Sequence, residues 1–227
     1  MQNNKTILAL DTTSSPLLVA VQNGGVSAGV KRAGIKQEEL LFPSIKKALD
    51  KKGAKFNKID KVFYVRGPGR FTGIRIGLTV ATMLRSLTGS EAVSATMFEV
   101  IYHKVQKSKE FKNWLKQNLS GKAAVVLHAF REEYFLQIFD GSAPQWFAKD
   151  DMLSFMAQYK EPLFVAGFDK ERTSLKDFFA GLKYTLASDK LSKVDARTLI
   201  EIAQAKSFEA DTLEPLYLKP ARFELGK

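Results

Sequence analysis

A glycine-rich turn between a short buried strand and a long helix constrains the fold of this chain most. Residues 67–78 read GPGRFTGIRIGL, and an apolar run at 62–65 precedes them. The apolar run predicts a strand, the glycines permit a tight turn, and the helical pattern that follows ends near Gly89. Strand, turn and helix in direct succession indicate an α/β fold.

The helix expected at 72–88 has an unusually wide apolar face. At about 100° per residue its apolar side chains cover an arc of roughly 220°, whereas a surface helix usually turns about 100° to its core. Gly73, Gly77 and Ala81 form a stripe of small residues within that arc, where a second backbone could come close. Two interpretations stay open: a helix enclosed in its own domain, or a helix covered on its outer side by a partner protein.

The same glycine-rich turn also raises the question of phosphate binding. The start of a helix suits phosphate because free N–H groups and the helix dipole point at the anion. The motif matches neither G-x-x-x-x-G-K-[ST] nor G-x-G-x-x-G with an acidic partner for a ribose, so tight structural turning is the alternative. Asp11, after the first expected strand, either coordinates magnesium or bonds to its own turn. Asp11, Gly67 and Gly69 are weak candidates for cofactor binding.

The rest of the chain alternates strands and helices. The expected strands are 6–10, 17–21, 26–31, 62–65, 91–95, 123–127, 134–139, 162–167 and 184–187. The expected helices are 37–52, 72–88, 96–107, 150–159, 173–182 and 194–206. We expect two α/β lobes, 1–105 and 106–191, and a C-terminal helix within 192–210 that packs back on the first lobe. No sequence repeat indicates a duplication.

The charge balance is basic in an otherwise ordinary globular composition. Among 227 residues, 45% are hydrophobic and 26% charged, and the formal net charge is +11, which suits a polyanion such as RNA. One group of lysines comprises Lys46, Lys47, Lys51, Lys52, Lys55, Lys58 and Lys61; a second comprises Lys104, Lys107, Lys109, Lys112 and Lys116. A solvated face and a direct tRNA contact both remain open for these groups.

Several classes of chemistry find no support in the sequence. There are no cysteines, which excludes disulfides and thiolate metal sites, and only two histidines, His103 and His128. No G-x-S-x-G motif is present, and we expect no catalysis by this chain alone. Neither a secretory signal nor a run of about 18 apolar residues is found, so we expect a cytoplasmic protein without a membrane span.

Five segments of the sequence resemble one family, the TsaB (YeaZ) proteins. Residues 67–78 are similar to the family signature GPGSFTGxRIGL. The other four segments are 7–13 (ILALDTT), 40–43 (LLFP), 94–99 (SATMFE) and 215–219 (PLYLK). The resemblance covers most of the chain, strongly over the first 105 residues and weakly in the middle.

The resemblance implies a fold and a role. The fold is a pair of RNase H-like lobes of the actin, sugar-kinase and Hsp70 ATPase superfamily, with mixed sheets flanked by helices. The role is a non-catalytic subunit that pairs with a TsaD-type catalytic subunit and works with a TsaE-type ATPase to make N6-threonylcarbamoyladenosine in tRNA. A catalytic TsaD-type subunit would carry a metal-binding H-x-x-x-H pair, which this sequence lacks.

The family's pairing surface is formed by its first two helices. The candidate interface residues are therefore Leu41, Ile45, Gly73, Ile74, Gly77, Leu78 and Ala81. Without the partner, the same face could pair two copies into a homodimer. ATP and magnesium are expected only within the complex, and none for the chain by itself.

The sequence departs from the family pattern in two places. Arg70 replaces a small serine in the glycine-rich turn, and residues 127–133 follow the family's D-A-R-x-x-E pattern only loosely, with His128 at the Asp and Glu133 at the Glu. An alternative of another class is an autonomous ATPase or phosphotransferase of the same fold. The residues that follow Asp11 keep the hydroxyls of a D-x-G-T phosphate turn but lack its glycine.

Overall fold

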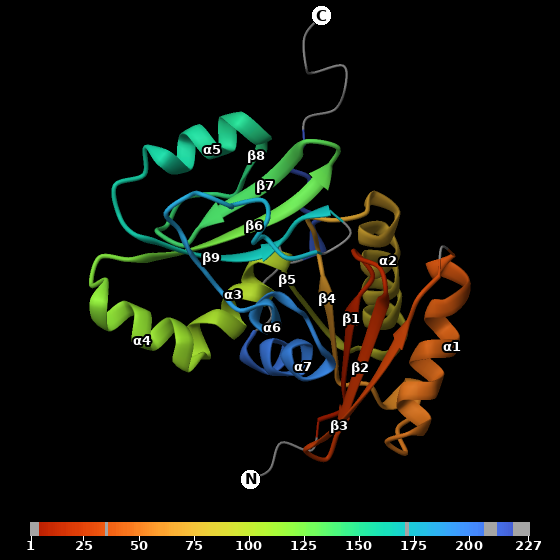
Figure 1. Ribbon diagram of the computed structural model, residues 1–227. Helices are drawn as coiled ribbons and strands as arrows, with labels where there is room; N and C mark the ends of the chain where they lie inside the picture. Colours follow the sequence, from red (N-terminus) through yellow and green to blue (C-terminus); the bar gives the residue numbers. More distant parts are fainter. Residues whose placement is uncertain (1–4, 35, 171–172, 207–212, 220–227) are drawn as a thin grey trace, which may run out of the picture. The chain divides into compact units, whose positions relative to one another are not determined.

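The computed structural model describes residues 5–34, 36–170, 173–206 and 213–219. The chain forms two compact units, Met1–Val100 with Val194–Leu216 and Ile101–Lys193 with Tyr217–Lys227 (Figure 1). The first crossing between them falls within α3 (Met97–Lys107). Residues 207–210 of the expected C-terminal segment lie outside the described residues.

The first unit is built on a five-stranded sheet in the order β3-β2-β1-β4-β5. Its strands are β1 (Ile7–Asp11), β2 (Leu17–Asn23), β3 (Val26–Arg32), β4 (Lys61–Val65) and β5 (Glu91–Ala95). The first three pair antiparallel, and β4 and β5 run parallel to β1. Every residue of β1 and β4 is buried, because a sheet covered on both faces shields its central strands, and such strands read as continuous apolar runs.

Helices cover both faces of this sheet. α1 (Gln37–Asp50) and α2 (Phe71–Thr88) share one core with β1, β2 and β4, and α7 (Ala196–Ala205) packs against β1 and β2 from the other side (Figure 1). Asp195 caps α7, since its carboxylate accepts from Thr198 N. A short 3-10 helix, Phe56–Lys58, precedes β4.

The second unit repeats the plan of the first. Its strands are β6 (Lys122–Phe130), β7 (Glu133–Ile138), β8 (Gln145–Ala148), β9 (Leu163–Phe168) and β10 (Thr185–Leu186). They lie in the order β8-β7-β6-β9-β10, with β6, β7 and β8 antiparallel and β9 and β10 parallel to β6. Both sheets are thus three-strand meanders with two strands added parallel to the first strand. The expected mixed α/β fold is confirmed, and the two sheets share one topology although the sequence shows no repeat.

Three further helices complete the second unit: α4 (Lys109–Gln117), α5 (Lys149–Ala157) and α6 (Asp189–Ser192). Met152 and Met156 of α5 pack into a core with alternate residues of β6, β7 and β9. The other face of the sheet meets α4, where Phe111 lies 5.2 Å from Phe164 of β9 between ring centroids.

The structure corrects the expected elements of the second unit. The helix predicted at 173–182 is wrong, because that segment forms turns. One backbone hydrogen bond, from Phe179 N to Leu175 O, spans four residues as in an α-helix, but the bond from Leu182 N to Phe179 O spans only three. Gly181, between the last two residues, has φ 78°. Leu175 and Phe179 still reach the core, so their helix-like spacing did not require a continuous helix. The sequence analysis also missed the short elements β8 and α6 and the helix α4.

No helix in the described part of the chain is long and apolar enough to cross a membrane.

Candidate functional site

The turn after β1 holds the carboxylate of Asp11 within itself. Thr13 donates to Oδ1 from its backbone nitrogen over 3.0 Å and from its hydroxyl over 2.7 Å, and the Ser14 hydroxyl donates to Oδ2 over 2.5 Å. Asp11 is 1% exposed. The sequence left two roles open for Asp11, magnesium coordination and hydrogen bonding within its own turn. The structure shows the hydrogen bonds within the turn.

The glycine-rich turn after β4 packs directly against this first turn. Arg70 N donates to Thr13 O over 2.7 Å, and Thr12 Oγ1 donates to Gly73 O over 2.7 Å. A Cβ added to Gly69 would lie 2.6 Å from Thr13 O, and one added to Gly73 would overlap the carbonyl of Thr12. The glycines therefore serve a close approach of two backbones, which leaves no room for a phosphate between the turns.

The C-terminal motif meets the same place. Leu216 N donates to Arg66 O over 2.8 Å, and Met97 N donates to Gly67 O over 2.8 Å. A Cβ on Gly67 would lie 2.7 Å from Leu216 O. The segments 7–13, 67–78 and 94–99, which carry much of the family resemblance, thus meet at one edge of the first sheet, together with Leu216.

A reciprocal cap begins α3 beside this edge. Thr96 N donates to Glu99 Oε2 over 2.7 Å, and Glu99 N donates to Thr96 Oγ1 over 3.0 Å. Lys206, which follows α7, donates to Glu99 Oε1 over 2.8 Å. Burial of the Glu99 carboxyl acts to raise its pKa, but the hydrogen bonds from Lys206 and Thr96 outweigh burial, and the pKa lies below its usual value.

The candidate interface residues of α1 and α2 lie mostly inside the first unit. Leu41, Ile45, Ile74 and Ala81 are at most 2% exposed. Gly73 and Gly77 are also buried, and Leu78 is partly buried against the same core. In the chain by itself these side chains thus pack within the first unit, and their contact with a partner stays a prediction.

The stripe of small residues on α2 is covered by the chain itself and not by a partner protein. A Cβ on Gly77 would lie 2.7 Å from Thr12 Oγ1 and 3.5 Å from the ring of Tyr64. The backbone that approaches the stripe is therefore the chain's own turn after β1. α2 packs against both this turn and the sheet, and two packing surfaces explain why its apolar arc is wider than that of an ordinary surface helix.

Other apolar residues of the two helices do reach the surface. Phe42 of α1 is 45% exposed, and Phe71 and Leu87 of α2 are 58% and 75% exposed. Ile76 and Met83 are half-buried. The Arg75 guanidinium lies 5.3 Å from the centre of the Phe71 ring. Phe42 lies beside the apolar face expected for its helix, and the sequence did not single it out.

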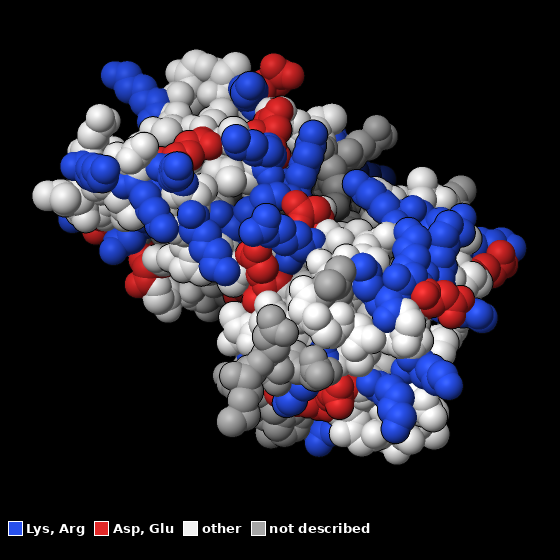
Figure 2. Space-filling model, turned by 90° about the horizontal axis from the view of Figure 1, so that it is seen from below, with Lys and Arg blue, Asp and Glu red and all other residues white. Residues whose placement is uncertain are grey.

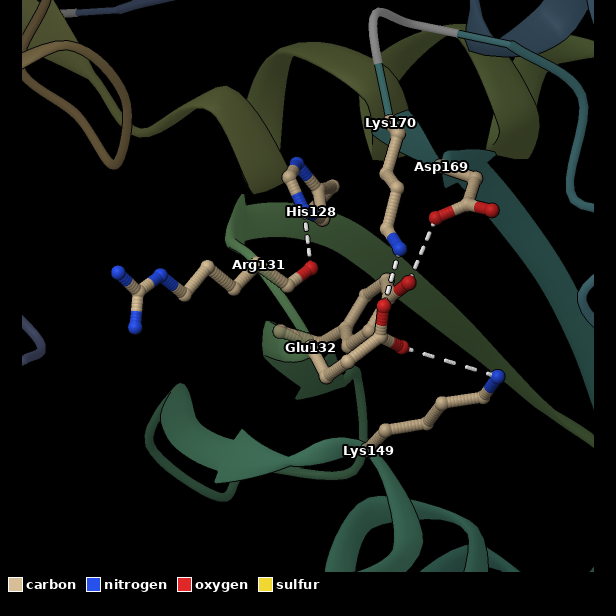
Figure 3. Close-up of polar contacts among 7 residues, drawn as sticks. His128, Arg131, Glu132, Lys149, Asp169 and Lys170 are labelled. Carbon is tan, nitrogen blue, oxygen red and sulfur yellow. Dashed lines mark hydrogen bonds and ion pairs between the residues drawn. The ribbon is translucent and has the colours of Figure 1, made fainter.

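The segment 127–133 forms the hairpin turn between β6 and β7 in the second unit (Figure 3). Arg131 has φ 53°, the left-handed region, and its carbonyl lies 2.8 Å from Nε2 of His128. Because a carbonyl can only accept, Nε2 carries the proton. His128 thus braces the turn.

Charged side chains around this hairpin pair with one another (Figure 3). Glu132 forms an ion pair with Lys170 and lies 3.8 Å from Lys149. The hydrogen bond from Lys170 holds the pKa of Glu132 below its usual value. Tyr134 donates to Asp169 over 2.6 Å, and burial followed by that bond raises the Tyr134 pKa. Glu133 accepts from Lys219 over 2.6 Å. Within the described residues, no group of three or more His, Asp or Glu side chains could hold a metal ion.

Comparison with known proteins places these features in a family. The model of the family described as TsaD, tRNA N6-adenosine threonylcarbamoyltransferase, matches residues 20–213. The chain belongs to this family. Within it the similarity is to TsaB (YeaZ) proteins, which confirms the resemblance of the motifs.

Two curated relatives and one solved structure carry that similarity. The tRNA threonylcarbamoyladenosine biosynthesis protein TsaB of Escherichia coli is 36% identical over 76 residues, 33% of this chain and 33% of that protein. TsaB of Haemophilus influenzae is 33% identical over 79 residues, 34% of each chain. The match thus spans about a third of each relative. YeaZ from Pseudomonas aeruginosa shares the fold with a TM-score of 0.65 at 18% identity, covering 94% of this chain and 100% of that one.

Proposed function

We propose that this chain is a non-catalytic scaffold subunit in the formation of N6-threonylcarbamoyladenosine in tRNA, acting in the cytoplasm. It pairs with a TsaD-type catalytic subunit, and a TsaE-type ATPase acts on the pair. ATP and magnesium bind within that complex and not to this chain alone. Without the partner, two copies pair through the same surface.

One observation carries the non-catalytic part of the proposal. In the first unit, the turn after β1 and the glycine-rich turn after β4 are closed on each other by the Arg70 N–Thr13 O bond and by the contact of Gly73 with Thr12. In the first turn, the backbone and hydroxyl of Thr13 and the hydroxyl of Ser14 donate to Asp11. A phosphate needs N–H groups that point into open space, so the closed turns support a scaffold over an autonomous phosphotransferase.

The outer side of α1 and α2 supports the pairing. Phe42, Phe71 and Leu87 are exposed large apolar side chains on the two helices that cover one face of the first sheet. Large exposed apolar side chains are typical of interaction surfaces, and aromatic anchors contribute most to such interfaces. The residues that contact the partner are then Phe42 and Leu87.

Leu87→Asp combined with Phe42→Asp tests this surface. We expect the variant to fold normally, because both side chains already face solvent, and to lose co-elution with a TsaD-type subunit in size-exclusion chromatography. Formation of threonylcarbamoyladenosine by the reconstituted enzyme set should fall at least about tenfold, since each lost anchor costs on the order of 2 kcal/mol.

Leu119→Asp is the matched control, because Leu119 is 92% exposed and lies in the second unit. It should co-elute with the partner and support modification like the unaltered chain. Unchanged pairing and unchanged modification in the Leu87→Asp, Phe42→Asp variant would refute the proposal.

A further inference from the structure

Helix α4 carries a row of lysines opposite its packed side. Lys109, Lys112 and Lys116 fall within an arc of about 60° when each residue turns about 100°, and all three are exposed. The opposite side holds Phe111, which is 6% exposed, and Trp114, whose ring centroid lies 5.4 Å from that of Phe164. Packing of the aromatic side fixes the direction in which the lysine row points.

The acidic residue of α4 is directed away from this row. Glu110 accepts from Ser188 N over 2.8 Å and from the Ser188 hydroxyl over 2.7 Å, which ties α4 to the start of α6. Lys190 of α6 and the following Lys193 are also exposed, and Lys193 O accepts from Lys104 of α3 over 2.7 Å. These contacts join α4 to the segment that contains α6, and that segment to α3.

The positive charge of these lysines is not neutralised by the protein. Across the described ranges of the chain, no acidic side chain lies within ion-pair distance of five exposed lysines: Lys109, Lys112, Lys116, Lys190 and Lys193. Figure 2 shows basic side chains spread over much of one face of the molecule, with fewer acidic ones between them. We call Lys109, Lys112 and Lys116 the α4 surface.

The other lysine group of the sequence is divided by the fold. Lys46 pairs with Asp50 at 2.9 Å. Lys61 is 8% exposed, lies 3.3 Å from Glu91 and donates to Lys206 O over 2.8 Å at the end of α7. Lys46 and Lys61 thus serve the protein itself, whereas Lys47, Lys51 and Lys55 of the same group are exposed and form no ion pair with a described acidic side chain, so they provide the comparison for the α4 surface.

The residue types of the α4 surface indicate whether its partner is a protein, a membrane or a nucleic acid. Protein interfaces favour aromatic residues and arginine and are depleted in lysine, whereas Asn113 and Gln117, the exposed neighbours of these lysines on α4, are polar. Membrane binding by a basic helix needs an apolar face free to enter the lipid, and that face of α4 is covered by the protein's own sheet. Lysines without apolar anchors suit phosphate groups, which they contact regardless of base sequence.

We infer that the α4 surface binds the phosphate backbone of RNA. The inference deepens the proposed function, on which it rests for the expectation that the RNA is a tRNA. Contact is through charge alone, so binding does not depend on base sequence and falls steeply with salt.

The test is fluorescence anisotropy with the full chain and a labelled, unmodified tRNA transcript, at salt between about 50 and 200 mM. Lys109→Gln, Lys112→Gln and Lys116→Gln are combined in one variant; glutamine keeps helix propensity close to that of lysine. We expect the affinity at low salt to fall at least about tenfold, and the slope of log K against log salt to fall by about 2, as three phosphate contacts are lost.

The matched control combines Lys47→Gln, Lys51→Gln and Lys55→Gln, which removes the same charge from exposed positions on and after α1. Its affinity should change less than about threefold, because it removes net charge and no contact. Equal losses in the two variants, no loss in the α4 variant, or no binding by the unaltered chain would each overturn the inference. Binding of poly-glutamate or of phosphatidylserine vesicles, dependent on the α4 lysines and as tight as that of the tRNA, would overturn the assignment to RNA.

The two proposals fail separately. Binding of RNA is measured on the isolated chain and needs no partner subunit. The Leu87→Asp, Phe42→Asp variant should lose pairing and retain full RNA affinity, so the two properties can be measured independently. If pairing proves absent while the α4 dependence holds, the scaffold role is refuted and RNA binding stands; the opposite pattern refutes RNA binding alone.

Discussion

At the scale of single residues, the glycines of the 67–78 motif are explained by one contact. Gly69 and Gly73 face the backbone of Thr12 and Thr13, and Gly77 faces the Thr12 hydroxyl. The sequence alone supported both a phosphate cradle and a tight structural turn at this point. The structure favours the turn, because the atoms that meet the glycines belong to the segment after β1.

Gly73→Ala should destabilise the first unit. The added methyl group would overlap the Thr12 carbonyl, so the backbone would have to shift, and we expect the free energy of unfolding to fall by about 3 kcal/mol. Urea denaturation monitored by circular dichroism measures the change. Thr79→Ala, at an exposed position of the same helix, is the control and should change stability by less than about 0.5 kcal/mol. Equal effects of the two substitutions would contradict the close-packing account.

At the scale of elements, short polar contacts decide where helices begin. The sequence pattern predicted one helix to residue 107, but Ser108 accepts from Phe111 N over 3.0 Å and starts α4. A serine between two helical segments is an N-cap signal, and it could have revealed α4. The cap of α3 by Thr96 and Glu99 also joins elements distant in sequence, since Lys206 after α7 binds the same carboxylate.

Glu99→Gln should show a pH-dependent loss of stability. The folded pKa of Glu99 is lowered, so its stabilisation is present above the unfolded value of about 4.3 and is lost as pH falls through the folded pKa. We expect a loss of about 1 kcal/mol at neutral pH that shrinks below about pH 4. Denaturation curves at several pH values measure it.

Glu39→Gln provides the comparison, because the Lys36–Glu39 pair is exposed, with side chains 69% and 62% accessible. Exposed pairs of this kind contribute little. A Glu99 effect that is the same at neutral and acid pH would contradict the ionised cap.

At the scale of the whole molecule, two sheets of the same topology each support their own core. In each unit, the turn after the first strand and the loop after the fourth lie at one edge of the sheet. In the first unit these loops close on each other, and in the second they are joined by the Glu132–Lys170 ion pair and the Tyr134–Asp169 hydrogen bond.

The isolated chain should not bind ATP with magnesium. Isothermal titration should give no heat beyond dilution, because the closed turns offer no N–H cradle for the phosphates. Asp11→Ala serves as the diagnostic variant, since an autonomous ATPase would lose binding through it. ATP binding by the unaltered chain that disappears in Asp11→Ala would support the phosphotransferase and refute the scaffold.

Prediction from sequence succeeded best where the determining contacts are local. The strands of the first sheet and the helices α1, α2 and α7 follow from apolar runs, helical periodicity and glycine turns. The same periodicity misled at 173–182, where Leu175 and Phe179 reach the core from turns. Short elements such as β8 and α6 are held by neighbours far away in sequence, and no local pattern identifies them.

The sequence by itself determined the strand–turn–helix plan, the family and the basic balance of the chain, because these depend on residue type and short-range spacing. Only the tertiary structure decided which side of α2 is inside, since its stripe of small residues is covered by a turn that lies some sixty positions earlier. It also decided which lysines remain without acidic partners on the surface. Burial and ion pairing depend on segments that folding brings together, and for that reason the wide apolar arc of α2 is filled largely by the chain's own turn and sheet.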